Sequence, residues 1–135
     1  MQTFLPYADF DQTAKCLDFR RLGKQRVEAM QILKALCFPG TSRWEHHPAV
    51  KMWSGCEEAL ALYYNTIVRE WVRRGYRNTM PSLLLEDIVL PSWLGSESFH
   101  ASHRSNLLRK DPEWYGQFGW DEPSDLPYIW PKGER

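Results

Sequence analysis

The 135-residue sequence contains few of the residues from which structural metal sites and disulfide frameworks are built. Its three cysteines are an odd number without CxxC spacing, which argues against both disulfide pairing and a zinc ribbon. The four histidines form two groups, His46-His47 and His100-x-x-His103, with no acid or thiolate at ligand spacing. We therefore expect a reduced protein that needs no metal and no cofactor.

Long apolar runs are also absent. No stretch approaches the roughly 20 apolar residues of a membrane span, and the N-terminal ten residues lack the regions of a signal peptide. The eight glycines are scattered, so there is no phosphate-binding loop and no dinucleotide fingerprint. These absences predict a cytoplasmic protein without membrane contacts.

Apolar and aromatic residues, by contrast, are plentiful. Hydrophobic residues make up 43% of the chain and charged residues 25%, which is typical of a globular domain with one core. Helical periodicity recurs, whereas no strand pattern of useful length is present. We expect a single all-α domain over residues 1–135, with an extended Pro-rich tail from Pro123 to Arg135 pinned by Tyr128 and Trp130.

Capping residues and helix breakers set the expected helix boundaries. Asp11 is expected to cap a short first helix, and Phe38-Pro39-Gly40 to end the second. Gly55 is expected to bend a long third helix that Gly75 ends. The expected helical ranges are 11–18, 21–37, 49–74, 80–88 and 102–110, followed by a helical turn that begins the segment 113–120.

The net charge is zero, with 17 basic and 17 acidic residues, yet the charges are unevenly placed. Acids gather near the C-terminus, so the basic clusters keep a local positive potential that suits a phosphate backbone. Ordinary solvated helix faces would give the same pattern. The clustered residues are Lys15, Arg20, Arg21, Lys24 and Arg26; Arg69, Arg73, Arg74 and Arg77; and His100, His103, Arg104, Arg109 and Lys110.

The helix expected over 21–37 carries the most informative pattern. Arg26 falls within its apolar face, where a long cation is costly unless it is paired or reaches a cavity. Arg21, Gln25 and Glu28 form a stripe at spacings of four and three, so their polar ends are expected to lie together. A single carboxylate of this kind can assist glycosidic cleavage; the alternative is a surface glutamate paired with a neighbouring cation.

Aromatic and basic residues nearer the C-terminus allow two interpretations. Trp114 and Tyr115 either stack on nucleic-acid bases or pack in the core. His100, His103 and Arg104 either grip phosphates or cap the helix that they open.

Three blocks of the sequence resemble the pyrimidine-dimer DNA glycosylase family of the endonuclease V type. LGKQRVE, residues 22–28, is similar to the family's helix that bears an arginine beside the catalytic glutamate. EWVRRGY, residues 70–76, is similar to a family helix that ends in a basic, glycine and aromatic turn. LLRKDPEWYGQFG, residues 107–119, resembles the family's basic stretch followed by Pro-x-Trp-Tyr. The order and spacing of the blocks agree with the family along most of the chain.

The resemblance implies an all-α enzyme that flips a nucleotide out of DNA and attacks its sugar C1′ with the N-terminal α-amine, which forms a Schiff base. An α-amine suits this step because it is partly neutral near pH 7. By position, the resemblance makes Glu28 the carboxylate that assists this step and the following β-elimination. It also implies that Arg21 and Arg26 grip phosphates around the extruded nucleotide.

Two features differ from the family pattern. Gln2 follows the initiator methionine where the family has a small residue, so either the Met1 amine is the nucleophile or water replaces it and the lyase step is lost. Arg26 and Glu28 are separated by one residue where the family has them adjacent. An alternative register would place Arg20-Arg21 there and leave no glutamate.

We interpret the chain as a DNA glycosylase of DNA repair, with abasic-site lyase activity if the amine is used, that excises a damaged or modified base. Duplex DNA is the expected partner and a monomer the expected state. The alternatives are a non-catalytic nucleic-acid-binding module and an N-glycosidase for free nucleosides or nucleotides. A pocket shared by Glu28 and the N-terminal amine would favour the enzyme. The expected catalytic residues are Met1, Gln2 and Glu28, and the expected DNA-binding residues are Arg20, Arg21, Lys24, Arg26, Arg73, Arg74, His100, His103, Arg104, Arg109, Lys110, Trp114 and Tyr115.

Overall fold

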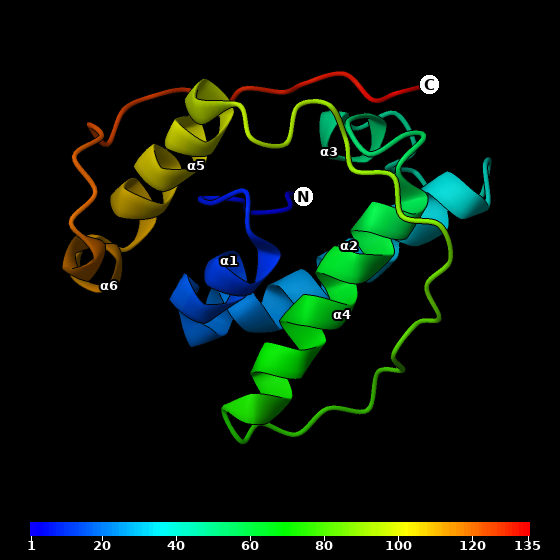
Figure 1. The fold of residues 1–135 in the computed structure, drawn as a ribbon, viewed down its shortest axis with the longest axis horizontal. Coiled ribbons are helices and arrows are strands. Elements are labelled where there is room, and N and C mark those ends of the chain that lie inside the picture. Colours follow the sequence, from blue (N-terminus) through cyan, green and yellow to red (C-terminus); the bar gives the residue numbers. More distant parts are fainter.

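Two long helices, α2 (Phe19–Cys37) and α4 (Glu57–Arg73), pack against each other at the centre of the computed structural model, which describes residues 1–135 (Figure 1). Asp18 caps α2, and its carboxylate accepts the Arg21 N–H at 3.4 Å. Helical spacing puts the apolar residues of both helices on facing sides, where their burial stabilises the pair. The buried apolar residues of this pair include Leu22, Ala29, Ile32, Leu60, Tyr63 and Ile67.

The first helix, α1 (Phe10–Cys16), packs on α4. It is capped by Asp9, whose carboxylate accepts the Gln12 N–H at 3.0 Å, and not by Asp11 as the sequence suggested. Asp11 instead lies in the first turn, where a carboxylate favours the positive end of the helix dipole.

The helix expected over residues 49–74 is interrupted at Gly55, where the sequence suggested only a bend. The glycine has φ of 88°, in the left-handed region that stops a helix. The result is a short helix α3 (Pro48–Lys51), a turn, and the separate helix α4. His47, the residue before α3, lies beside the N-terminus as a result.

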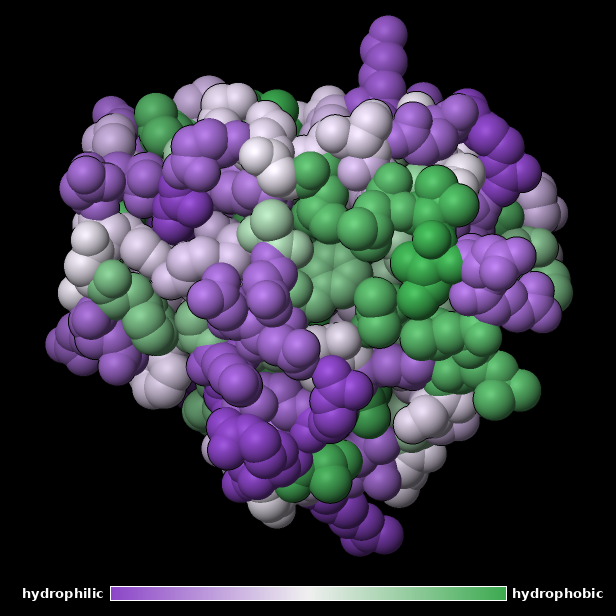
Figure 2. Space-filling view, viewed as in Figure 1, coloured by the Kyte–Doolittle hydropathy of each residue, from purple (hydrophilic) through white to green (hydrophobic).

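Residues 76–96 contain no helix, so the expectation of a helix over 80–88 was wrong. The Asn65 side chain binds the backbone of Leu83 twice, donating to its carbonyl at 2.8 Å and accepting its N–H at 2.9 Å. Tyr64 likewise donates to the Pro81 carbonyl. These side chains of α4 satisfy backbone groups that a helix would have used internally. The segment contributes to an apolar surface visible in Figure 2, with exposed Leu84, Leu85, Ile88, Val89 and Leu90.

The chain then forms α5 (Glu97–Lys110), α6 (Pro112–Tyr115) and a single 3-10 turn, Gly116–Phe118. We call residues 122–135 the C-terminal strap. It has no helix or strand and passes from α6 along α5 toward α3 (Figure 1). All regular elements are helical and form one compact domain. None of the helices is both long and apolar enough to cross a bilayer.

Candidate active site

The N-terminal segment enters the core and is fixed there by Gln25 of α2. The Gln25 side-chain oxygen accepts the Phe4 N–H at 3.0 Å, and its amide group donates to the Gln2 carbonyl at 2.8 Å. The Tyr63 hydroxyl donates to the same Gln25 oxygen at 2.6 Å. Because Gln25 is fully buried, these bonds form without competition from water and fix the position of the first residues.

Two buried histidines of α5 hold the same segment from the other side. His103 accepts the Leu5 N–H at its Nδ1 atom, 3.0 Å away, and His100 Nδ1 lies 2.8 Å from the Leu5 carbonyl oxygen. His100 Nε2 accepts the Gly95 N–H at 2.9 Å, so its Nδ1 carries the proton that it donates to Leu5. Burial lowers the pKa of both imidazoles, that of His103 to about 3. Both shifts favour the neutral form of the rings in the folded protein.

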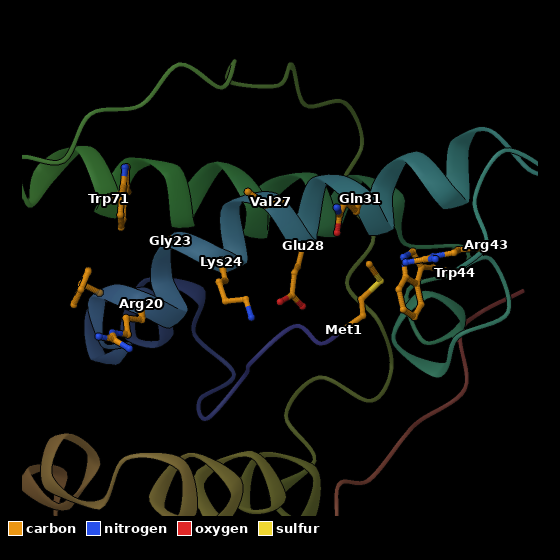
Figure 3. A pocket seen from close by; sticks show the side chains of 11 residues that line it. Met1, Arg20, Gly23, Lys24, Val27, Glu28, Gln31, Arg43, Trp44 and Trp71 are labelled. Atoms are coloured by element: carbon orange, nitrogen blue, oxygen red, sulfur yellow. The ribbon is translucent and has the colours of Figure 1, made fainter.

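Glu28 of α2 lies at the end of this fixed segment. Its Oε2 atom accepts the Gln2 N–H at 2.8 Å. Consecutive backbone nitrogens are at most about 3.6 Å apart, so this bond holds the carboxylate close to the α-amine of Met1. Figure 3 shows Glu28 directed from α2 toward the chain at Met1.

Two adjoining cavities meet at this point. The first, of about 800 Å³, is a groove along α2 that we call the α2 groove; Phe19, Gly23, Val27, Gln31, Arg43, Trp44 and Trp71 line it (Figure 3). The second, of about 620 Å³, is bounded by the C-terminal strap, and we call it the strap pocket; Gln2, Phe4, Arg21, His47, Lys110, Tyr128 and Trp130 line it. The residues common to both are Met1, Arg20, Lys24 and Glu28. The carboxylate and the N-terminal residue thus share a site.

Cations surround the carboxylate. Arg20 and Lys24 are exposed, and Arg21 is held by an ion pair with Asp18 at 3.1 Å. Lys110 reaches the strap pocket from the end of α5. Partial burial and then the nearby positive charges, among them Arg21 and Lys24, lower the pKa of Lys110. Cations therefore outnumber the single carboxylate, Glu28, among the residues that line the two cavities.

Several residues predicted to bind DNA have side chains that bond to other groups inside the protein. His100 and His103 hold Leu5, as described above. Arg104 is buried and pairs with Glu97 and Glu122, and it donates to the Pro6 carbonyl at 2.8 Å. Tyr115 is fully buried and donates to Asp18 at 2.5 Å. None of these side chains lines the two cavities.

Arg73 and Arg74 are also engaged internally. Both bind the buried carboxylate of Glu70, at 2.6 and 2.8 Å. Arg74 also donates to the carbonyls of Ala14 and Lys15 at the end of α1. These pairs give Arg73 and Arg74, two of the four arginines of the basic cluster at the end of α4, partners within the protein.

Trp114 and Arg109 lie on the surface and are not among the residues that line the two cavities. Trp114 donates its indole N–H to the Cys16 carbonyl at 2.7 Å and keeps 37% of its surface exposed. Arg109 is exposed and bonds to Asn106 and to the Ser124 carbonyl.

Arg26, the cation expected on the apolar face of α2, stacks on Trp71 with its guanidinium carbon 4.3 Å from the ring centroid. It also donates to the Asn78 side chain at 2.7 Å. These contacts join α2 to α4, through Trp71, and to the segment after it, through Asn78. Arg26 lines neither cavity, which favours a role in stability over one in phosphate binding.

We expect Arg26→Ala to lower the free energy of unfolding by roughly 1–3 kcal/mol, because it removes a cation–π contact and a hydrogen bond. Urea unfolding followed by tryptophan fluorescence measures this. The slope of log affinity against log salt for duplex DNA should stay unchanged. Arg20→Ala is the matched control. Its free energy of unfolding should stay unchanged, and its slope of log DNA affinity against log salt should be smaller by about one phosphate contact. A reduced slope in Arg26→Ala would assign this arginine to the DNA surface.

Four residues of the strap pocket were not predicted as site residues: Phe4, His47, Tyr128 and Trp130. His47 precedes Pro48 and caps α3, accepting the Ala49 N–H at 3.0 Å with its Nδ1 atom. Burial and the nearby N-terminal charge lower the pKa of His47, while Glu28 opposes this shift. The sequence predicted a helix start at residue 49, close to His47, but nothing local placed that start beside Glu28.

Comparison with known proteins gives one match. A family model described as pyrimidine dimer DNA glycosylase matches residues 1–83, which include α1 to α4, Met1 and Glu28. No curated protein and no solved structure matches the chain. The matched region covers more than half of the sequence. The chain therefore belongs to the pyrimidine dimer DNA glycosylase family.

Proposed function

We propose that this protein is a DNA glycosylase that excises a damaged or modified base from duplex DNA, with the α-amine of Met1 as nucleophile and Glu28 as proton carrier. The observation that supports this most is the 2.8 Å bond from the Gln2 N–H to Glu28, in a site lined by both Met1 and Glu28. Family membership supports the same class of activity. Gln2 has a positioning role, since its backbone orients the carboxylate.

In the proposed reaction, the lone pair of the neutral α-amine bonds to C1′ while the base leaves with the electrons of the glycosidic bond and takes up a proton. The new N–C1′ group then loses a proton to Glu28. Ring oxygen O4′ leaves C1′ and receives that proton, which gives a protonated Schiff base. Removal of a C2′ proton expels the 3′-phosphate, and this β-elimination is the abasic-site lyase step.

Cations at the rim of the two cavities suit the phosphates that flank an extruded nucleotide. Arg20 and Lys24 are exposed on α2, and Arg21 and Lys110 line the strap pocket. Phosphate contacts of this kind position a duplex without reading its sequence. The protein would act as a monomer, since both candidate catalytic groups come from one chain.

Borohydride trapping on duplex DNA with a single abasic site tests the nucleophile. Reduction of the Schiff base at C1′ leaves a stable secondary amine, which digestion and mass spectrometry locate. We expect the adduct on the N-terminal residue, and no adduct in a chain that carries extra residues before Met1. Tight DNA binding without an adduct would instead indicate excision by water or a non-catalytic module.

A further inference from the structure

Residues 84–90, which we call the apolar segment, expose large side chains beside α4 (Figure 2). Leu84 has 95% of its surface exposed and Val89 has 59%. Single exposed apolar side chains are common on soluble proteins, whereas a contiguous group of them marks an interaction surface. Five of the seven residues of the apolar segment form such a group: Leu84, Leu85, Ile88, Val89 and Leu90.

A hollow of about 220 Å³ continues this surface at Leu90. Phe10 of α1 and Leu62 of α4 supply apolar walls. Arg69 and Asp11 also line the hollow and pair with each other at 3.0 Å, so its lining carries no net charge. A hollow of this kind suits one apolar side chain of a docked partner.

The main chain of the apolar segment has unused hydrogen-bonding groups. The Glu86 N–H donates to the Glu58 side chain at 2.9 Å, and no other backbone N–H of residues 84–90 has a partner in the protein. Their carbonyl groups accept no hydrogen bond from the protein either. Each of these groups is a strong donor or acceptor, so the segment can also bind the main chain of an incoming peptide.

The charges of the apolar segment have one sign. Glu86 and Asp87 form no ion pair, and no lysine or arginine occurs between Asn78 and His103. Acidic residues repel nucleic-acid phosphates and anionic lipids. A two-fold dimer through this surface would place the acids of one copy against those of the other. The complementary partner instead carries lysine or arginine beside its apolar residues.

We propose that the apolar segment and the hollow beside it form a docking surface for a peptide segment of another protein, one that combines apolar and basic side chains. None of the residues that form this surface lines the α2 groove or the strap pocket. A segment bound here therefore does not take the place of Met1 or Glu28, and the docking surface does not depend on the proposed glycosylase function.

Selection from a phage-displayed library of random dodecapeptides tests this surface. We expect the selected sequences to combine leucine or aromatic residues with a net positive charge. The synthesised peptides should bind Val89→Ser and Glu86→Lys at least about ten-fold more weakly than the unmodified chain, because these changes remove an apolar contact and reverse a complementary charge. Val72→Ser and Glu113→Lys change an exposed valine and an exposed glutamate outside the surface. These matched controls should bind the peptides as the unmodified chain does.

Three results would overturn the docking surface. The first is a selection that gives acidic peptides, or peptides that bind Val89→Ser and the unmodified chain equally. The second is a dimer in analytical ultracentrifugation that Val89→Ser dissociates, since a second copy then covers the surface. The third is binding to vesicles of phosphatidylcholine and phosphatidylserine that Val89→Ser abolishes. Borohydride trapping on an abasic duplex should be equal in Val89→Ser and the unmodified chain, so it reports the proposed function separately.

Discussion

Glu28→Gln is expected to abolish base excision while DNA binding persists. The amide oxygen of glutamine can still accept the Gln2 N–H, so the position of the N-terminal segment should be kept. The amide cannot take up and return a proton. Since proton transfer by a positioned side chain contributes about 10²–10⁴-fold, we expect single-turnover excision to slow by at least about 100-fold.

Glu58→Gln is the matched control for this variant. Glu58 also accepts a backbone N–H, that of Glu86 at 2.9 Å, but it lies outside both cavities. The excision rate of Glu58→Gln should equal that of the unmodified chain. Both Glu28→Gln and Glu58→Gln should bind duplex DNA with unchanged affinity. Undiminished excision by Glu28→Gln would remove this carboxylate from the reaction and favour a different acid.

The location of Glu28 could be anticipated because it depends on helix geometry. Spacings of four and three place Arg21, Gln25 and Glu28 on one side of α2, and the structure has this side facing the N-terminal segment. The role of Gln25 could not be anticipated. Its partners Phe4 and Tyr63 lie 21 and 38 residues away in the chain, and no local pattern encodes such contacts.

The helix predictions succeeded where local signals act alone and failed where tertiary contacts compete with them. The helix expected over 21–37 is present as α2, since its apolar periodicity and its end agree with its packing. Residues 80–88 have helix-favouring leucines, yet they form no helix, and Asn65 binds both backbone groups of Leu83 at their centre. Gly55 was recognised as a weak point, but its positive φ ends the helix instead of bending it.

Charge clusters in the sequence did not separate binding surfaces from structural pairs. Arg73 and Arg74 share one buried acid, Glu70, and Arg104 reaches Glu122, which is 18 residues away. By contrast, Lys110 meets the cations of α2 only because α5 folds back over the N-terminal segment. Which cations remain available for phosphates is therefore decided by the fold.

Acid should destabilise the protein well above the pH at which carboxylates titrate, because His103 must stay neutral in the fold. Burial lowers its pKa to about 3, against about 6.5 in an unfolded chain. Between these values the unfolded chain binds a proton that the folded one does not, so stability is fully present above pH 6.5 and falls as the pH approaches 3. Lowering the pH from 7 to 5 should remove about 2 kcal/mol through this residue. His100, whose pKa is also lowered, should add to the loss.

Urea unfolding at pH 7, 6 and 5, followed by tryptophan fluorescence, measures this dependence. His103→Asn places an amide oxygen near the position of Nδ1, where it can accept the Leu5 N–H without titrating. In this variant the free energy of unfolding should lose most of its dependence on pH between 7 and 5 and retain the part due to His100. His46→Asn, at an exposed histidine, should keep the full slope. A slope that is the same in all three chains would show that neutral His103 is not what holds the N-terminal segment, and the placement of the α-amine beside Glu28 would then depend on the remaining contacts of that segment, such as those of Gln25 and His100.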